Sequence, residues 1–309
     1  MIETFDLGKR FDDFWAVRNV NIIVKPGQVL ALLGQNGAGK TTTVRLLNSI
    51  LTPSSGTAQI CGFDIIKQAE QVRSVVGVLT EQHGLYLRMT GRDYLDFFGQ
   101  VYHLSTFERL KRREDLLLMF DLEQYGNRKI GEYSKGMRQK LALARTLIHQ
   151  PPVLLLDEPT SAMDPESAKM VRDSISNLRS GNRTIIICTH NLIEAEALAD
   201  QVAIIYHGEI LVSGSLPELK SQLLGHVEFD VMINEPWPDS YFDLPDGLEM
   251  TVKGENSRRF KVKNPPVTNP LLVKRLIEKH LEVVAIQEVP RTLEQVYLKA
   301  MEQIKHVQD

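Results

Sequence analysis

A glycine-rich segment near the start of the chain carries the clearest chemical signal. GQNGAGKT, from Gly34 to Thr41, has two glycines around four residues and then Lys and Thr. Glycine lets the backbone turn several N–H groups toward one phosphate, Lys40 can reach the phosphate chain, and Thr41 can offer a hydroxyl to Mg²⁺. The pattern predicts a phosphate-binding loop between a strand and a helix. The residues assigned to this loop are Gly34, Gln35, Asn36, Gly37, Ala38, Gly39, Lys40, Thr41 and Thr42.

Two adjacent carboxylates form a second candidate site. The run VLLLDE, from Val153 to Glu158, is four apolar residues followed by Asp157 and Glu158. Open α/β sheets bind ligands beyond the carboxyl ends of their strands. Asp157 is placed to hold Mg²⁺, and Glu158 is placed to orient or deprotonate an attacking water. A strand that ends in two acids is weak evidence alone, but beside a phosphate-binding loop on one sheet it favours phosphoryl chemistry.

The elements that must position these groups follow from hydrophobic patterning. Strand-sized apolar runs alternate with helical segments, which predicts a parallel sheet covered on both faces. Residues 1–26 contain short strands, expected to form an antiparallel N-terminal β subdomain, and residues 90–150 are expected to form a helical insert. Beyond this core, half-buried strands and a helix from near Pro270 predict a small α/β domain. The expected fold is α/β, with domains at 1–222 and 223–309.

Composition narrows the possible functions. The net charge of −3 argues against a nucleic-acid partner gripped by bulk positive charge, and no apolar run approaches the roughly 18 residues of a membrane helix. The N-terminus, with its acidic residues, does not have the pattern of a signal peptide. Cys61 and Cys188 are far apart, so we expect two small buried side chains rather than a disulfide or a metal site.

Three further segments resemble the motifs of ABC ATPases. EYSKGMRQKLALARTL, VLLLDEPTSAMDP and TIIICTH are similar to the family's signature, its catalytic acid segment and its switch histidine, in the family's order. The likeness covers roughly residues 1–220. It implies that Ser134 and Gly136 meet the γ-phosphate held by another subunit, that His190 contacts the γ-phosphate, and that Asp164 lies at a dimer interface. Lys135 and Met137 depart from the commonest signature, as in exporters whose ATPase is a separate polypeptide.

Two positions needed by the resemblance are ambiguous. Phe11 lies 29 residues before Lys40 and matches the aromatic on which adenine stacks, but Phe14 and Trp15 are rivals. In the loop that couples the ATPase to its membrane partner, the family's glutamine falls on Glu81, with Gln82 directly after it. Either Glu81 or Gln82 is expected near the metal, and Glu81 is the candidate for a catalytic role.

The resemblance implies an ATPase that uses ATP and Mg²⁺ and dimerises with itself or with a sister ATPase. It implies a separate transmembrane permease as partner, export as the direction of transport, and a place on the cytoplasmic face of the plasma membrane. The alternative is a soluble ABC ATPase of translation or DNA repair. The single cassette and the lack of sustained heptads between Lys40 and Ser134 weigh against that alternative, and Glu158 with His190 weighs against a regulator that binds ATP without hydrolysing it.

Overall fold

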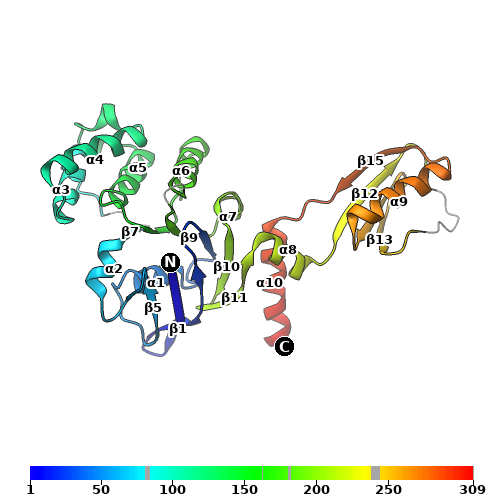
Figure 1. Cartoon of the computed structure of the whole chain (residues 1–309), viewed down its shortest axis with the longest axis horizontal. Helices are drawn as coiled ribbons and strands as arrows, with labels where there is room; N and C mark the ends of the chain where they lie inside the picture. The colour runs from blue at the N-terminus through cyan, green and yellow to red at the C-terminus, as the bar shows by residue number, and fades with distance from the viewer. Residues whose placement is uncertain (81–83, 162, 180–181, 238–243, 309) are drawn as a thin grey trace. The chain divides into compact units, whose positions relative to one another are not determined.

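The computed structural model describes residues 1–80, 84–161, 163–179, 182–237 and 244–308, with side chains as far as residue 303. The chain divides into two compact units, Met1–Leu216 and Pro217–Asp309 (Figure 1). The helix α8, Leu216–Leu224, begins at this division. Residues 217–222, which the sequence pattern assigned to the first domain, therefore fall in the second unit.

The first unit opens with an antiparallel sheet, as expected. Its strands are ordered β2-β1-β5-β6, and β3 pairs with β1. The β1–β2 hairpin places Phe11 directly opposite Phe14 at its tip. The strands are β1 (Ile2–Phe11), β2 (Phe14–Val20), β3 (Ile23–Val24), β5 (Ser55–Ile60) and β6 (Phe63–Asp64).

The second sheet of this unit has the order β11-β10-β4-β9-β8-β7. The pairings from β10 to β7 are all parallel, and β11 joins as an antiparallel edge. Strands β4, β9 and β8 are consecutive neighbours, so their carboxyl ends open at one edge of the sheet. The strands are β4 (Val29–Leu33), β7 (Val76–Leu79), β8 (Val153–Asp157), β9 (Thr184–Thr189), β10 (Gln201–Tyr206) and β11 (Glu209–Ser215).

Both faces of this parallel sheet are buried. On β8, Leu154 and Leu156 pack into a cluster with α3 to α7, whereas Val153 and Leu155 pack into a second cluster with α1 and the antiparallel sheet. The alternation follows from the two-residue period of a strand. Truncation of a fully buried leucine such as Leu155 to alanine is expected to cost about 2–5 kcal/mol.

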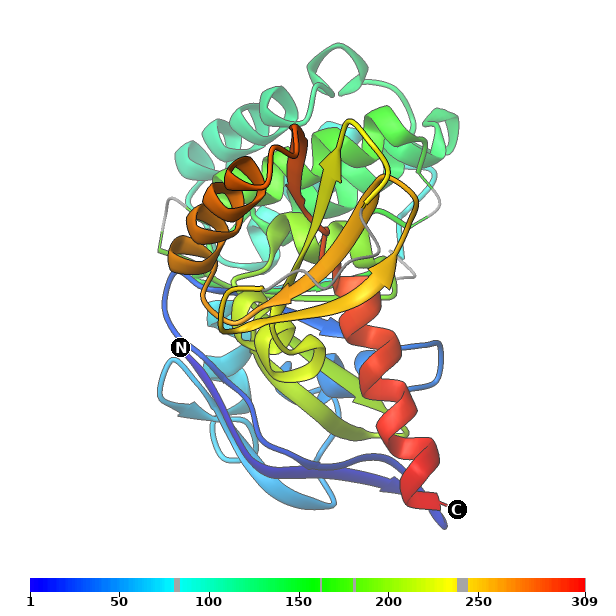
Figure 2. The same cartoon turned by 90° about the vertical axis from the view of Figure 1, so that its right-hand side faces the viewer.

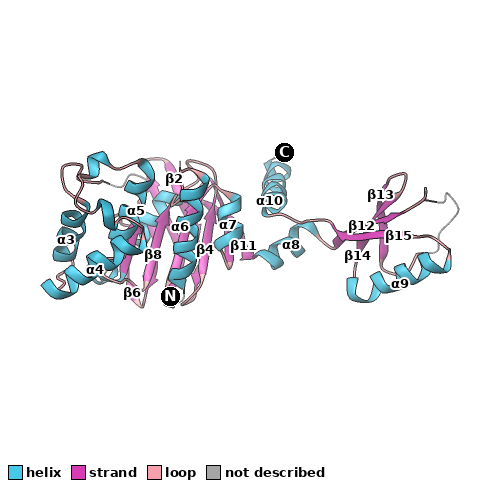
Figure 3. Ribbon diagram, turned by 90° about the horizontal axis from the view of Figure 1, so that it is seen from above, coloured by secondary structure: helices cyan, strands magenta, loops and turns pink. Residues whose placement is uncertain are grey.

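Helices cover the two faces and hold the ends of the sheet. Figure 3 shows α5, α6 and α7 along one side of the strands. Several of the helix starts have side-chain caps: Ser134 caps α5, Asp164 caps α6 with Pro165 as the first helical residue, and Ser105 forms a capping box with Glu108 at the start of α4. The helices are α1 (Lys40–Leu47), α2 (Ala69–Val75), α3 (Gly91–Val101), α4 (Thr106–Met119), α5 (Lys135–Thr146), α6 (Pro165–Leu178) and α7 (Leu192–Leu198).

The second unit is a four-stranded antiparallel sheet with one helix packed on a face. The order is β13-β14-β12-β15, and α9 lies along the sheet in Figure 2. The core includes Val231, Phe260, Leu272 and Leu276. The remaining elements are β12 (Val227–Ile233), β13 (Leu248–Lys253), β14 (Ser257–Val262), α9 (Pro265–Glu278), β15 (Val283–Glu288) and α10 (Leu293–Gln308).

The structure corrects two local expectations. The helix expected near Pro270 begins at Pro265, because prolines at the first helical positions need no N–H donor, and Pro270 then lies inside α9. Cys61 was expected to be buried and is exposed, in a turn where its φ is 51°; Cys188 is buried as expected. Among the helices in the described ranges, none has both the length and the apolar character needed to cross a membrane.

Candidate functional site

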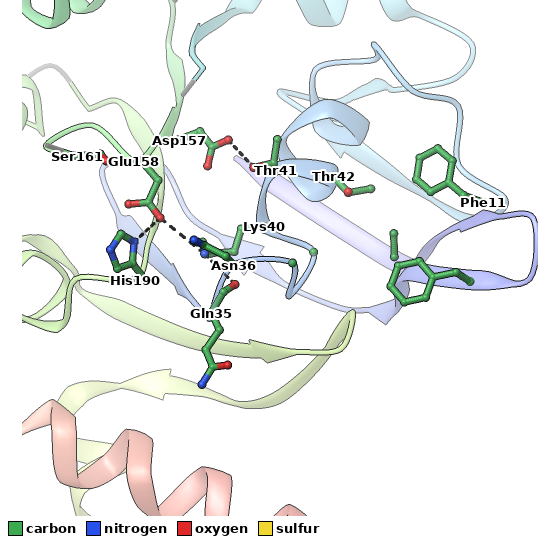
Figure 4. A pocket seen from close by; sticks show the side chains of 14 residues that line it. Phe11, Gln35, Asn36, Lys40, Thr41, Thr42, Asp157, Glu158, Ser161 and His190 are labelled. Atoms are coloured by element: carbon green, nitrogen blue, oxygen red, sulfur yellow. Dashed lines mark hydrogen bonds and ion pairs between the residues drawn. The ribbon is translucent and has the colours of Figure 1, made fainter. Parts of the chain in front are cut away.

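A cavity of about 610 Å³ opens where β4, β8 and β9 end, beside the β1–β2 hairpin (Figure 4). It brings together residues from both motifs described above. The lining residues are Phe11, Phe14, Ala16, Gln35, Asn36, Gly37, Gly39, Lys40, Thr41, Thr42, Asp157, Glu158, Ser161 and His190. Gly34 and Ala38 complete the same loop without lining the cavity.

The glycine-rich loop depends on its glycines for its shape. Gly39 has φ 110°, and a Cβ at that position would lie 2.5 Å from the carbonyl oxygen of Ala16, so no larger residue fits. Lys40 folds back over the loop, and its Nζ donates to the carbonyl oxygens of Gly34 at 2.6 Å and Gln35 at 3.2 Å. Its ammonium group is thereby held against the loop that lines the cavity, beside the first turn of α1, which has no acidic residue. This arrangement suits an anion.

Thr41 and Asp157 meet across a long stretch of sequence. The Thr41 hydroxyl donates to Oδ2 of Asp157 at 2.7 Å. A hydroxyl and a carboxylate are hard oxygen ligands of the kind that Mg²⁺ accepts alongside water and phosphate. The donor set of these two residues therefore fits a magnesium ion.

Glu158, Lys40 and His190 converge within the cavity. Oε1 of Glu158 lies 2.9 Å from Nδ1 of His190 and 3.7 Å from Nζ of Lys40. The Lys40 and Glu158 side chains are only 6% and 11% exposed, whereas His190 is 59% exposed. A largely buried carboxylate thus faces a buried ammonium, with a more accessible imidazole beside them (Figure 4).

The backbone at Glu158 is unusual. Its φ is 51°, in the left-handed region that few non-glycine residues occupy. Its N–H donates to the carbonyl oxygen of Cys188 on β9 at 2.8 Å. Burial raises the pKa of the Cys188 thiol, and the charge on Asp157 raises it further. Cys188 is therefore a neutral, apolar support beneath the site at pH 7.

The aromatic side of the cavity comes from the β1–β2 hairpin. Phe11 and Phe14 both line it, and the two residues are 44% and 58% exposed. Nζ of Lys9 lies 5.3 Å from the centre of the Phe11 ring. Trp15, the other rival, is not among the lining residues in the described part of the chain. The hairpin register brings two phenylalanines to the cavity where one was expected.

The remaining predicted residues lie elsewhere on the chain. In the described ranges, Ser134, Gly136 and Asp164 do not line this cavity. Ser134 accepts from the N–H of Met137 at 3.2 Å, and Asp164 accepts from the N–H of Ser167 at 2.9 Å. The hydrogen bonds from the Ser167 backbone and hydroxyl hold the pKa of Asp164 below its ordinary value.

Two predicted residues lie outside the described part of the chain, and two residues that line the cavity were not predicted. Glu81 and Gln82 lie outside the described residues, so the choice between them stays a prediction. Ala16 and Ser161 line the cavity but were not expected from sequence. Their closeness in sequence to predicted residues could have indicated them, since Ala16 follows Phe14 by two residues and Ser161 follows Glu158 by three.

The fold and the cavity define the class of protein. A phosphate-binding loop at the end of β4, next to acids on β8 and a histidine after β9, is the arrangement of a P-loop nucleotide hydrolase. The family model described as "ABC transporter" matches residues 17–161.

Individual relatives support the same family. The chain is 42% identical over 224 residues to the ABC transporter ATP-binding protein NatA of Bacillus subtilis (strain 168), covering 71% of this chain and 91% of NatA. It is 34% identical over 252 residues to the Nod factor export ATP-binding protein I of Cupriavidus metallidurans, covering 81% and 83%. A solved structure described as an ATP-binding subunit of an ABC transporter superposes with a TM-score of 0.68 at 28% identity, covering 73% and 94%.

The chain therefore belongs to the ATP-binding proteins of ABC transporters, and its fold is an ABC-type P-loop ATPase with an added C-terminal α/β unit. Proteins of this family hydrolyse ATP.

Proposed function

We propose that Glu158 orients and activates the water that attacks ATP, while Lys40 and the loop from Gly34 to Thr42 hold the phosphates. The observation that carries this proposal is that Oε1 of Glu158 lies within 3.7 Å of both Nζ of Lys40 and Nδ1 of His190. A general base must lie within reach of the water, and a cation beside it stabilises the charge that develops on the phosphoryl oxygens. His190 is placed to contact the γ-phosphate. The exposed rings of Phe11 and Phe14 supply faces on which adenine can stack.

Thr41 and Asp157 are the residues that would hold Mg²⁺, with Glu81 or Gln82 as a further contributor. The ion, when bound, supplies positive charge to the phosphate oxygens. The direct hydrogen bond from Thr41 to Asp157 keeps these two potential metal ligands together at the end of β8.

The active assembly is a dimer of this chain with itself or with a sister ATPase. Ser134 and Gly136 open α5, and Asp164 opens α6, yet these residues stand outside the chain's own cavity. Their proposed γ-phosphate contacts need a cavity on a second subunit. ATP would then join the two chains, and its hydrolysis would release them.

Light scattering tests this assembly. The Glu158→Gln variant should run as a dimer with Mg-ATP and as a monomer with ADP. A variant that also carries Lys40→Ala is the control and should stay monomeric. A monomer at high protein concentration and saturating ATP would contradict the composite site.

ATP hydrolysis would drive transport through a separate transmembrane permease at the cytoplasmic face of the plasma membrane, in the direction of export. Both relatives described above are named as ATP-binding proteins, one of an ABC transporter and the other of Nod factor export. This favours a transport role over translation or DNA repair. We assign nucleotide chemistry to the first unit, Met1–Leu216, with the helical insert at 90–150 facing the permease, and a steadying or regulatory role to the C-terminal unit.

The permease proposal has a direct test. Co-expression with a candidate permease of about six membrane helices should yield a complex whose ATPase rate rises on reconstitution into vesicles. A complex that forms without any change in ATPase rate or substrate movement would count against transport.

A further inference from the structure

The turn that follows Glu158 is held from two helices. The carbonyl oxygen of Pro159 accepts from Nε2 of Gln139, on α5, at 2.7 Å. The hydroxyl of Thr160 donates to Oε1 of Glu194, on α7, at 2.8 Å. Two consecutive residues after the carboxylate are thus each fixed by one side chain from a different element.

These contacts are deeply buried. Gln139 is 5% exposed, Thr160 is 8% exposed and Glu194 is fully buried. Burial raises the pKa of Glu194, and its hydrogen bonds with Thr189 and Thr160 oppose the increase. A buried polar group that loses its partner is strongly penalised, so these bonds specify one arrangement of the turn.

Each of the two anchoring helices begins at or close after a residue with a proposed phosphate contact. Helix α5 starts after its N-cap Ser134, and Gln139 lies in its second turn. Helix α7 starts after its N-cap Asn191, which directly follows His190. A shift of either helix therefore reaches the backbone next to Glu158 through a single hydrogen bond.

Glu158 itself needs such support. Its left-handed backbone persists only where the surrounding structure holds it. We propose that Gln139 and Glu194 are positioning residues for Glu158, because they clamp the Pro159–Thr160 turn and so set where the carboxylate points. The inference rests on the proposed role of Glu158 in hydrolysis. A misplacement of about 1 Å can lower a rate by roughly 10²-fold.

Thr160 offers the sharpest test, because one hydroxyl can be removed without a change in shape. Thr160→Val should lower kcat about 10- to 100-fold and leave KM for ATP within about twofold. Thr160→Ser keeps the hydroxyl and should restore most of kcat. The matched control is Thr146→Val, which removes another buried hydroxyl, one that donates to the Leu143 carbonyl oxygen at 2.7 Å; it should leave kcat unchanged.

A double variant separates positioning from stability. Thr160→Val leaves the Glu194 carboxyl group without that donor, whereas Thr160→Val with Glu194→Leu removes both partners and should regain much of the lost melting temperature. The double variant should still have the low kcat. Gln139→Leu should show the same split between kcat and KM.

Two outcomes would overturn the inference: an unchanged kcat in Thr160→Val, or a kcat that tracks the melting temperature in every variant. Glu158→Gln is assayed in parallel. If Glu158→Gln turns over normally, the proposed function fails; if it is slow while Thr160→Val is normal, only the positioning role fails.

Discussion

The parallel sheet of the first unit and the antiparallel sheet of the second unit bury their strands in different ways. In the first unit, β4, β8 and β9 are buried at every residue. In the second unit, β12 has only two fully buried residues and β13 has none. Where both faces of a sheet are covered, polar side chains can reach solvent and ligand only at the strand ends, and that is where Asp157, Glu158 and His190 lie.

In the antiparallel sheet of the second unit, charged side chains pair with one another across neighbouring strands. Arg259 forms a two-pronged ion pair with Asp230 on the neighbouring strand, with both hydrogen bonds at 2.8 Å. This arginine and this aspartate neutralise each other, whereas the charged groups at the strand ends of the parallel sheet surround a cavity. In the proposed function the chemistry of this chain depends on the strand ends of the first unit. We therefore expect substitutions in the two units to have unequal effects on ATP hydrolysis.

The largest expected effect is at Gly39. Gly39→Ala forces a Cβ against the Ala16 carbonyl oxygen at φ 110°. We expect a loss of about 3 kcal/mol or more in the free energy of unfolding, together with lost ATP binding. Gly62→Ala is the control, because its φ is 84° but nothing lies within 4 Å; it should cost about 1–2 kcal/mol and leave ATP binding intact. Urea denaturation measures the free energy of unfolding, and nucleotide titration measures ATP binding. Equal losses of stability in Gly39→Ala and Gly62→Ala would contradict the steric argument.

A smaller effect is expected from His149, which stacks on Tyr102 with ring centres 3.7 Å apart. Burial lowers its pKa from 6.5 to about 4. Because the unfolded chain then binds the extra proton, stability is full above pH 6.5 and falls by about 1 kcal/mol per pH unit between pH 6.5 and 4. His149→Phe keeps a stacked ring without the titration, so its urea midpoint should depend less on pH in this window. Identical pH dependence in both proteins would be the contrary result.

The smallest effect is expected in the second unit. The hydrogen bond from Arg259 lowers the pKa of Asp230, but both side chains are about a third exposed. Solvent screens such a pair, so Asp230→Asn should cost less than about 1 kcal/mol and leave the ATPase rate unchanged. Denaturation and ATPase assays of this variant check both values. A strongly reduced ATPase rate would show that the second unit shapes the site after all.

Much of the site could be predicted because its motifs are local. The segment from Gly34 to Thr42 runs from the end of a strand into the first turn of a helix, and the acids end an apolar strand, so short segments carry the information. Asp164 and Ser134 cap helices, as their residue types suggest. The parallel sheet was predictable because continuous apolar strands need cover on both faces.

Contacts between residues that lie far apart in the sequence could not be predicted from it. The Thr41–Asp157 hydrogen bond joins residues 116 positions apart, and the Gln139–Pro159 contact depends on how α5 packs. Phe14 lines the cavity beside Phe11 because of the hairpin register. The burial of Cys61 was predicted wrongly because the residue lies in a turn between two strands, which its sequence context did not indicate.

The most direct measurement compares ATP turnover and ATP affinity in Glu158→Gln with those of Glu209→Gln, an acid on β11 outside the cavity lining. Glu158→Gln should bind ATP normally and lose about 10²–10⁴-fold in turnover, the range for a positioned general base. Glu209→Gln should match the unaltered chain in both. Near-normal turnover by Glu158→Gln would remove this carboxylate from the mechanism and with it the assignment of hydrolysis to the strand ends of the first unit.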